Sequence, residues 1–381
     1  MDLTYTPEQE AFRAEVRAWL LANVPRLDPP DTREAFEEHR AWEHRLFEAG
    51  YAGLSWPSSY GGRGAGVVEQ AIFDEEYLLA DGPERVNVVG HKLMAPTLFE
   101  HGTEEQKQGW LEPMLRGDEI WSQGFSEPDA GSDLAGIRCR AALDGDEFVV
   151  NGQKIWTSYG AFADWIFALV RTGPSASRHG GITFLAVDMS SPGVEARPIV
   201  QLDGHAGFAE VFFTDARVPA ANVIGAVDDG WNVAMTTLAA ERDSPARPAA
   251  RYARDLRDLA RIARARDLDT DPVVRDALGA LAARAESYRL VTLQTLTQLQ
   301  RGEALGFEAS VTKLLWSELE RDIFELGVRL LGPYADTPGE VVGDVTEWQN
   351  RYWYARAATI YAGTSEIQRN IIAERVLGLP R

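Results

Sequence analysis

The residues from Trp121 to Leu134, WSQGFSEPDAGSDL, have types and spacing suited to holding a polar ligand. Gly124, Pro128 and Gly131 interrupt a run of short hydroxyl and carboxylate side chains, which predicts a structured turn, not a strand or a long helix. Such a turn exposes backbone N–H groups and hydroxyls, and these groups bind phosphates or the polar edge of a ring. The alternative is an ordinary loop between domains, and composition alone leaves both readings open.

The bulk composition predicts a globular protein of two or three domains. The chain has 381 residues, 45% of them hydrophobic, and 11 tryptophans. Its net charge of −20 argues against nucleic acid or an anionic membrane as a partner, because negatively charged surfaces would repel it. The polar, acidic N-terminus and the absence of a long apolar run favour a soluble, cytoplasmic protein.

Metal and disulfide chemistry find little support in the sequence. Cys139 is the single cysteine, which excludes an intrachain disulfide and a cysteine-based metal cluster. The six histidines, among them His39, His44 and His91, lack convincing ligand spacing, so we expect no metal site.

The elements that must position the 121–134 stretch follow the order helices, sheet, helices. Helices are predicted from Pro7, at about 32–49, 67–79, 86–101 and 103–117, and after the sheet at about 231–241, 245–266, 271–301, 307–331 and 365–377. Capping boxes, Thr6 with Gln9 and Thr103 with Gln106, are expected to start two of these helices. Strands are predicted at about 165–170, 182–187, 194–199 and 210–218, with a hairpin turning at Asn151-Gly152. The fold class is α+β, with an N-terminal helical domain (1–119), a middle antiparallel β domain (120–226) and a C-terminal four-helix bundle (227–381).

Four segments in this order resemble the acyl-CoA dehydrogenase family of flavoenzymes. They are FSEPDAGSD (Phe125–Asp133), NGQKIWTS (Asn151–Ser158), EVFFTDARVP (Glu210–Pro219) and YAGTSEIQR (Tyr361–Arg369). The likeness covers essentially the whole chain. In general similarity, the chain looks most like the actinobacterial branch that acts on bulky acyl-CoAs such as those with steroid side chains.

The resemblance implies FAD as cofactor and assigns its ligands residue by residue. Phe125 and Ser126 would lie at the polar edge of the flavin ring, and Ser132 would reach the pyrophosphate. Trp156 would lie along the isoalloxazine with its large flat face, and Ser158 would bond flavin N5. The alternatives are a core tryptophan in a strand and a hydroxyl at the end of a hairpin.

The last motif adds two cofactor ligands and shows a departure from the family. Thr364 and Glu366, which open the last predicted helix, would also bind FAD. Many members place the catalytic glutamate directly before Gly-Thr in this motif, where this chain has Ala362. An alanine cannot take a proton, so either the chain is inactive or the base comes from elsewhere.

A minority of the family carries the base on the first long helix after the sheet, followed by an arginine, and this chain has Glu241 and Arg242 there. We therefore expect Glu241 to remove the proton and Arg242 to contact the substrate. The sequence Asp243-Ser244-Pro245 predicts a helix break beside it. The alternative for Glu241 is a surface ion pair with a nearby arginine.

Ala362 still has the backbone N–H that the family uses to bind the thioester oxygen. The thioester oxygen in the family accepts a hydrogen bond from the backbone N–H of this residue and another from a ribityl hydroxyl of FAD. Polarising the carbonyl stabilises the enolate-like charge that develops as the proton leaves. The expected division is therefore a base at Glu241 and an oxyanion donor at the Ala362 N–H.

Two elements that complete a neighbouring subunit's FAD site in many members do not match. The first should lie between Arg264 and Leu278, and the second is RLLGP at Arg329–Pro333, with Arg in place of Gln and Pro in place of Gly. We expect an oligomer, a tetramer by resemblance, and the mismatches favour a heterotetramer with a related chain.

The leading hypothesis is an FAD-dependent acyl-CoA dehydrogenase of lipid or steroid catabolism. It would convert an acyl-CoA thioester to the trans-2-enoyl-CoA and pass electrons to an electron-transfer flavoprotein or a similar acceptor. The alternatives are a flavin oxidase or monooxygenase on the same scaffold, and a non-catalytic partner subunit of a hetero-oligomeric dehydrogenase. Acyl chain length and ring content are not encoded in any recognisable residue.

Overall fold

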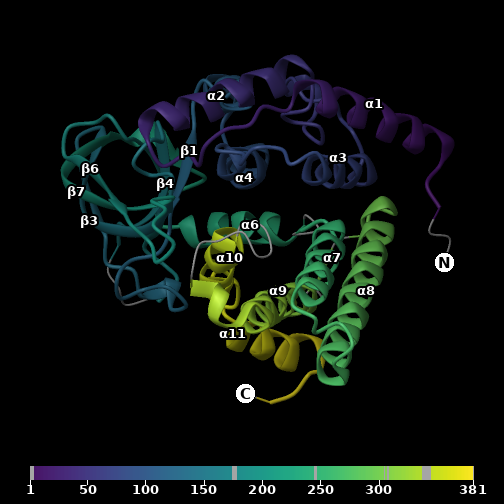
Figure 1. Ribbon diagram of the computed structural model, residues 1–381. Coiled ribbons are helices and arrows are strands. Elements are labelled where there is room, and N and C mark those ends of the chain that lie inside the picture. Colours follow the sequence, from purple (N-terminus) through teal and green to yellow (C-terminus); the bar gives the residue numbers. More distant parts are fainter. Residues whose placement is uncertain are drawn as a thin grey trace. The chain divides into compact units, whose positions relative to one another are not determined.

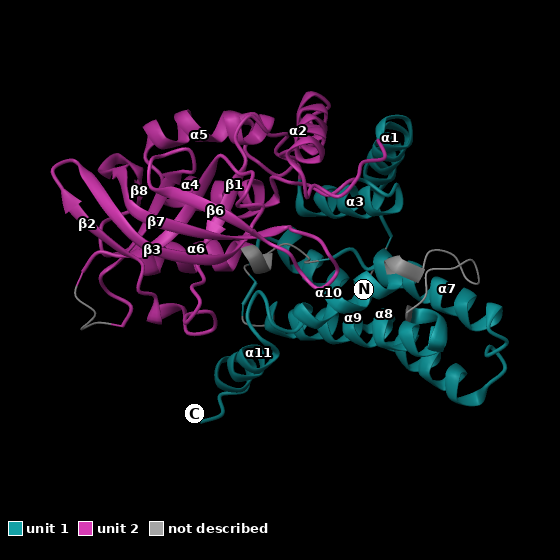
Figure 2. Ribbon diagram, turned by 60° about the vertical axis from the view of Figure 1, so that its left-hand side comes forward, with its two compact units in different colours: residues 1–24, 66–82, 242–381 teal, residues 25–65, 83–241 magenta. Residues whose placement is uncertain are grey.

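The structure is a computed structural model that describes residues 4–173, 178–243, 247–303, 305–306, 309–336 and 345–380. Side chains at 241–243, at 336 and at 345–347 lie outside the description. The chain divides into two compact units (Figures 1 and 2). One unit contains Met1–Val24, Gly66–Gly82 and Arg242–Arg381, and the other contains Pro25–Ala65 and Pro83–Glu241.

The first unit is helical. Its elements are α1 (Pro7–Asn23), α3 (Val67–Leu79), α7 (Ala250–Ala265), α8 (Pro272–Gln300), α9 (Ala309–Leu331), α10 (Val345–Ala358) and α11 (Ser365–Ile371), which continues as a π-helical turn (Ile372–Val376). The predicted capping box of α1 is present, because Thr6 and Gln9 bond each other's backbone N–H groups. The core of the unit is built around Tyr252, Leu259, Tyr288, Trp316 and Phe324.

Two predictions for this unit need correction. The helix expected from Pro245 begins at Ala250, and the expected break at Ser244 and Pro245 lies outside the described residues. Helix α10 was not predicted. Its residues Trp348, Tyr352 and Ala355 pack into the core, but the segment lacks a clear apolar stripe because arginines and tyrosines alternate along it.

The second unit contains an eight-stranded sheet and the helices α2 (Arg33–Glu48), α4 (Ala95–His101), α5 (Glu104–Arg116) and α6 (Gly230–Asp243), the last of which runs across the unit boundary. The strands are β1 (Trp121–Gly124), β2 (Arg140–Asp144), β3 (Glu147–Ser158), β4 (Trp165–Arg171), β5 (Ile182–Asp188), β6 (Val194–Ile199), β7 (Phe208–Pro219) and β8 (Val223–Ile224). Their order is β6-β7-β3-β2-β4-β5-β8, and β1 pairs with β4. The pairs are antiparallel except β1–β4 and β2–β4, so the prediction of a mostly antiparallel sheet is confirmed.

The hairpin predicted at Asn151-Gly152 is wrong. Strand β3 runs straight through these residues, and the chain reverses instead at Gly145 between β2 and β3. Asn151 and Asp215 of β7 exchange hydrogen bonds of 3.0 and 2.9 Å, and the β3–β7 register shifts at this point. Gly152 is needed for packing, because a Cβ there would lie 2.7 Å from the Cα of Cys139. The Asn-Gly pair therefore marks a bulge, not a turn.

The 121–134 stretch begins with a strand, contrary to prediction. Residues 121–124 pair in parallel with residues 165–168 of β4, and the rings of Trp121 and Trp165 stack with centroids 5.3 Å apart. The predicted turn starts only after Gly124. The large aromatic surface of Trp121 outweighs the glycine and serine content of the segment, because it is buried against β4.

Candidate functional site

A buried ion pair fixes the loop after β1 against strand β3. The Lys154 Nζ lies 2.7 Å from the Glu127 Oε1, and the Lys154 side chain is fully buried. The same Nζ donates to the Phe125 carbonyl, and the Glu127 carboxylate also accepts the backbone N–H groups of Arg138 and Cys139. Glu127 is therefore a structural residue of the loop.

The backbone joins the same two segments at a second place. The Ile155 N–H donates to the Ser126 carbonyl at 3.0 Å, and the Ser122 hydroxyl donates to the Ser158 carbonyl at 2.7 Å. The carbonyls of Phe125 and Ser126 are engaged in this way, and the N–H groups of Glu127 and Ala130 donate to each other's carbonyls. The Ser126 hydroxyl, which has no partner among the described residues, is left to offer a ligand.

Trp156 is presented to the surface by an irregularity in β3. Its φ is +60°, in the left-handed region, and the β3–β7 register shifts between Lys154 and Thr157. The side chain is 55% exposed and meets the edge of Phe208 at a centroid distance of 6.2 Å. A bulky residue in this conformation stores backbone strain, which is typical of functional sites.

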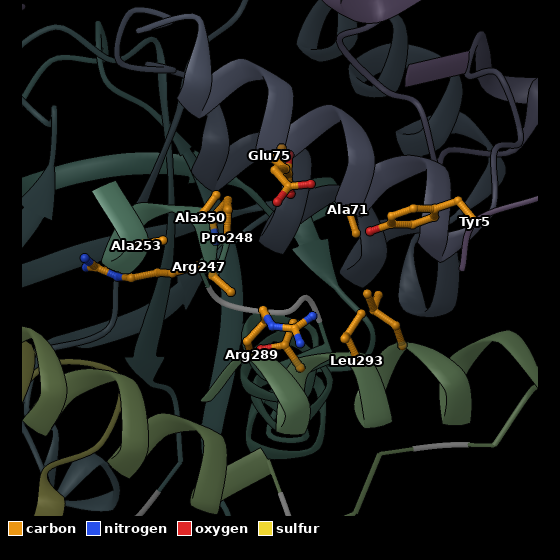
Figure 3. Close-up of a pocket in the computed structure, with 13 residues that line it drawn as sticks. Tyr5, Ala71, Glu75, Arg247, Pro248, Ala250, Ala253, Arg289 and Leu293 are labelled. Atoms are coloured by element: carbon orange, nitrogen blue, oxygen red, sulfur yellow. The ribbon is translucent and has the colours of Figure 1, made fainter. Parts of the chain in front are cut away.

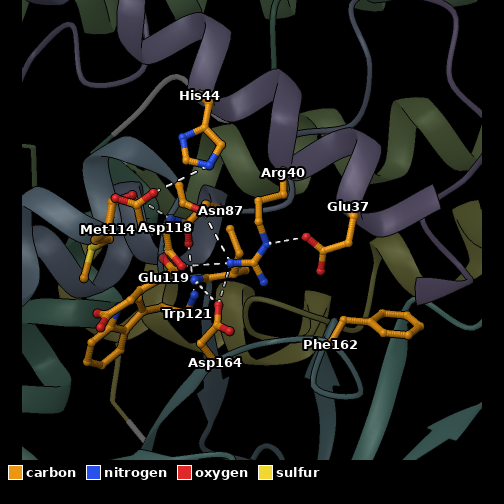
Figure 4. Close-up of polar contacts among 12 residues, drawn as sticks. Glu37, Arg40, His44, Asn87, Met114, Asp118, Glu119, Trp121, Phe162 and Asp164 are labelled. Atoms are coloured by element: carbon orange, nitrogen blue, oxygen red, sulfur yellow. Dashed lines mark hydrogen bonds and ion pairs between the residues drawn. The ribbon is translucent and has the colours of Figure 1, made fainter. Parts of the chain in front are cut away.

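Polar side chains of Asn87, in a turn, and Asp164, in the bend before β4, hold the start of β1 (Figure 4). The Asp164 carboxylate accepts the Ile120 N–H at 2.8 Å and the Arg40 guanidinium at 2.9 Å. The Asn87 Oδ1 accepts the Trp121 N–H at 3.0 Å, while its Nδ2 donates to the Met114 carbonyl. These bonds fix the start of β1, and with it the direction of the chain into the predicted ligand-binding loop (residues 125–134).

A buried histidine stiffens the same framework. The His91 Nε2 donates to the Met114 carbonyl at 2.9 Å, and its Nδ1 faces the Arg85 guanidinium at 3.2 Å, so Nδ1 is the acceptor. Burial lowers the pKa of His91 to about 4. Arg85 also binds the buried Glu43 carboxylate, and it lowers the pKa of Glu43 although burial alone would raise it.

The loop after β1 is exposed toward its end, at residues 131–133. Ser132 lies at the surface, beside Asp133, which pairs with Arg178. Asp129 faces Arg138 across 3.5 Å at a highly exposed position. The loop therefore keeps an accessible hydroxyl at 132 among residues that form surface ion pairs.

In the helical unit, the turn that contains Ala362 has an unusual backbone. Ala362 has a φ of +53°, and its carbonyl accepts the Gln368 Nε2 at 2.9 Å. No described residue accepts the Ala362 N–H. The turn thus presents one backbone donor to whatever ligand lies beside it.

The helix after this turn starts with a hydroxyl cap. Thr364 accepts the Ile367 N–H at 3.2 Å, and Glu366 is exposed in the first turn. Hydrogen bonds from its own backbone N–H and from Thr364 lower the pKa of Glu366. Helix α11 is seven residues long, shorter than predicted, because the chain passes into a π-helical turn at Ile372.

Glu241 and Arg242 lie in the last turn of α6, but their side chains are outside the described part of the structure.

The candidate residues fall on both units. Phe125, Ser126, Ser132, Trp156, Ser158 and Glu241 belong to the sheet-containing unit, and Arg242, Ala362, Thr364 and Glu366 belong to the helical unit. Phe125, Ser126, Trp156 and Ser158 lie on the two segments that the β1–β3 contact joins, whereas Ser132 lies at the exposed end of the loop. Ala362, Thr364 and Glu366 lie in one turn and the helix that follows it.

The groups presented are those that a flavin nucleotide requires. Trp156 offers a flat apolar face, and Ser126, Ser132 and Ser158 offer hydroxyls. Three buried polar atoms in the two motifs, Thr157 Oγ1, Ser365 Oγ and Gln368 Oε1, have no hydrogen-bond partner within the described residues. Orphaned polar atoms at a site indicate that a ligand or water supplies the missing partner. The residues present therefore fit FAD.

A cavity of about 290 Å³ opens within the helical unit (Figure 3). Its lining combines apolar residues such as Ala71, Pro248 and Leu293 with charged residues such as Glu75 and Arg289. Figure 3 shows Arg247 extending away from Arg289 and Leu293, so its guanidinium leaves the cavity instead of filling it.

Sequence analysis missed several residues that hold these sites. Lys154 and Gln368 lie inside two of the quoted motifs, so their position was a usable signal. Arg247, Lys313 and Glu320 of the helical unit carried no such signal, because their partners are distant in the sequence.

Two further properties concern the described residues as a whole. No helix among them is long and apolar enough to cross a membrane. No group of three or more histidine, cysteine, aspartate or glutamate side chains in these parts of the chain is placed to hold a metal ion.

Comparison with solved structures gives full-length matches. The structure of the Tcur3481–Tcur3483 steroid ACAD is similar over 100% of both chains, with a TM-score of 0.87 and 32% sequence identity. The ChsE4–ChsE5 complex from Mycobacterium tuberculosis is similar over 100% of both chains, with a TM-score of 0.84 and 31% identity.

Sequence comparison agrees with the structural matches. Acyl-CoA dehydrogenase IpdE1 of Mycobacterium tuberculosis is 45% identical over 386 residues, with 98% of each chain covered. Residues 6–118, 122–216 and 228–377 match the acyl-CoA dehydrogenase N-terminal, middle and C-terminal domains. On these grounds the chain belongs to the acyl-CoA dehydrogenase family.

Proposed function

We propose that this protein is an FAD-dependent dehydrogenase that converts an acyl-CoA thioester to the trans-2-enoyl-CoA. FAD, when bound, would accept the β-hydrogen as hydride at N5. Phe125, Ser126 and Ser158 would contact the flavin ring, and Trp156 would cover it. Ser132, Thr364 and Glu366 would contribute contacts to the rest of the cofactor.

The observation that carries the proposal is the free donor at Ala362. Its N–H has no acceptor among the described residues, and its backbone is held in the left-handed region. A donor of this kind stabilises negative charge on a thioester oxygen as the α-proton leaves. Because alanine cannot take that proton, Glu241 is the proposed base and Arg242 the proposed substrate contact.

Ring-containing acyl-CoAs are the proposed substrate class. Support comes from the similarity over 100% of both chains to the solved structure described as the Tcur3481–Tcur3483 steroid ACAD. A panel of short-chain, long-chain and steroidal acyl-CoAs, added anaerobically to the purified flavoprotein, tests this assignment. We expect the steroidal members to bleach the flavin most rapidly, whereas reduction by a non-thioester substrate alone would indicate an oxidase.

The base assignment has a direct test with a matched control. Glu241→Gln should keep bound flavin and slow flavin reduction by about 10²- to 10⁴-fold, the usual contribution of a general base. Asp243→Asn removes a carboxylate from the same helical turn and should leave the rate nearly unchanged. Equal rates for wild type and Glu241→Gln would refute the assignment.

We also propose that the functional assembly pairs this chain with a related second chain. Arg266, within the first element that departs from the family pattern, lies over the ring of Tyr334, the residue that directly follows the second element, at 4.5 Å. Two of the similar solved structures carry titles that name two components. Purification of the chain alone with full FAD occupancy and turnover would contradict this proposal, and co-purification with a related chain that restores FAD would support it.

A further inference from the structure

The turn at Ala362 depends on a buried polar network that lies behind it in the helical unit. The Ala362 N–H belongs to the peptide group that joins it to Tyr361, so the orientation of Tyr361 sets the direction of this donor. We propose that Arg247 and Tyr361 form a positioning pair that aims the Ala362 N–H at the thioester oxygen. This inference rests on the proposed function, and it assigns Arg247 a positioning role through Tyr361, not a catalytic one.

The Tyr361 hydroxyl is held by the Arg247 guanidinium. The Arg247 Nη2 donates to the Tyr361 hydroxyl, and the Arg247 Nη1 lies 2.5 Å from the Glu320 Oε2. The guanidinium also lies over the Trp316 ring at 4.5 Å. Its backbone is fixed as well, because the Tyr288 hydroxyl donates to the Arg247 carbonyl at 2.8 Å. Arg247 therefore has little freedom to move.

The rest of the turn is held by two other donors. The Lys313 Nζ donates to the Ala358 carbonyl, the last residue of α10, at 2.6 Å. The Gln368 Nε2 donates to the Ala362 carbonyl from the following helix. Lys313 and Gln368 thus fix the two ends of the turn, and Arg247 fixes the side chain between them.

The negative charge of Glu320 does not by itself explain why Arg247 is buried beside it. Arg251 also bonds Glu320, at 3.2 Å, and one arginine is enough to balance one carboxylate. Buried ion pairs contribute little net stability compared with apolar packing, so a second buried arginine at this place is costly. What distinguishes Arg247 from Arg251 is its bond to the Tyr361 hydroxyl. A buried network of hydrogen bonds such as that of Arg247, Glu320 and Tyr361 favours one geometry.

The test compares Tyr361→Phe and Arg247→Lys with Arg251→Lys in the flavin-loaded protein, together with its partner chain if one is required. Tyr361→Phe keeps the ring and removes only the hydroxyl that binds Arg247. Arg251→Lys is the matched control, because it disturbs the same glutamate without a bond to Tyr361.

Enolisation of bound acetoacetyl-CoA, followed by absorbance against pH, reports how strongly the oxyanion is stabilised. We expect Tyr361→Phe and Arg247→Lys to raise the apparent pKa of this enolisation and to lower kcat by about 10- to 100-fold, with KM changed much less. Arg251→Lys should lower thermal stability without moving the enolisation pKa.

The outcomes separate the two proposals. If Tyr361→Phe, folded and flavin-loaded, keeps the wild-type enolisation pKa and kcat, the positioning role is overturned and the dehydrogenase proposal stands. An equal shift in Arg251→Lys would also overturn it, because charge balance alone would then be responsible. If the wild type neither enolises acetoacetyl-CoA nor is reduced by any acyl-CoA, both proposals fail.

Discussion

Glu127 and Lys154, which fix the ligand loop in the sheet-containing unit, both belong to the motifs they support. In the helical unit, Arg247 lies 114 residues from Tyr361 and Lys313 lies 45 residues from Ala358, the residues that they bind at the Ala362 turn, and Glu320 lies 73 residues from Arg247. The ion pair that holds the loop of the sheet-containing unit is therefore supplied by the quoted motifs themselves, whereas the Ala362 turn of the helical unit also depends on side chains outside its motif. A motif search finds the first kind of support and overlooks the second.

The largest effect should come from breaking the buried pair of the sheet site. Glu127→Ala leaves the Lys154 ammonium buried without a counter-charge, which typically costs about 3–5 kcal/mol. We expect a matching loss in urea unfolding and a loss of bound flavin. Adding Lys154→Met to this variant should recover part of the stability. Asp129→Asn, which breaks only an exposed pair, should change stability by less than about 1 kcal/mol.

The second-largest effect should come from His91, a buried histidine of the sheet-containing unit that lies far in the sequence from the loop after β1. The folded-state pKa of His91 is about 4, below the ~6.5 of an unfolded histidine, so the unfolded chain holds the extra proton between these values. Unfolding free energy should therefore fall as pH drops from 6.5 to 4, by up to about 3 kcal/mol.

His91→Gln supplies the control for this pH dependence. A glutamine retains one donor for the Met114 carbonyl and one acceptor for Arg85, but it does not titrate. Urea unfolding at several pH values should show a flatter profile for this variant. An unchanged profile would assign the acid sensitivity to other groups.

A smaller effect is expected when the helical site loses one of its distant supports. Lys313→Met removes the donor to the buried Ala358 carbonyl, and an unsatisfied buried carbonyl costs about 1–3 kcal/mol. Thermal unfolding should show this loss, and enolisation of acetoacetyl-CoA should also weaken because the turn is released at one end. If the variant loses stability but enolisation is unchanged, the bond at Ala358 does not influence the position of the Ala362 N–H.

The smallest effect concerns a surface link of the sheet-containing unit. The Asp31 carboxylate, 2.6 Å from the His205 Nδ1, raises the pKa of His205. The resulting stabilisation is complete below ~6.5 and disappears as pH rises through the higher folded-state pKa. Because both side chains are partly exposed, it should amount to less than about 1 kcal/mol. NMR titration of His205 in wild type and Asp31→Asn measures the shift directly.

Local sequence predicted what depends on neighbouring residues. The capping boxes at Thr6 and Thr103 are present as expected, since each cap and its partner are three residues apart. The order of helices and sheet followed from hydrophobic periodicity. The Asn151-Gly152 turn was wrong because its conformation depends on Asp215, 64 residues later. The role of Arg247 could not be predicted for the same reason, since Tyr361 is 114 residues away.

Cys139 gives the sheet-containing unit an internal reporter. The thiol is 2% exposed, and burial raises its pKa to about 11, so the native protein offers reagents almost no thiolate at neutral pH. Modification must therefore wait for the packing around Gly152 to open. Because the chain has a single cysteine, the rate of labelling measures how often this part of the sheet opens, without any added probe. Comparing that rate with and without FAD would show how far the cofactor clamps the sheet.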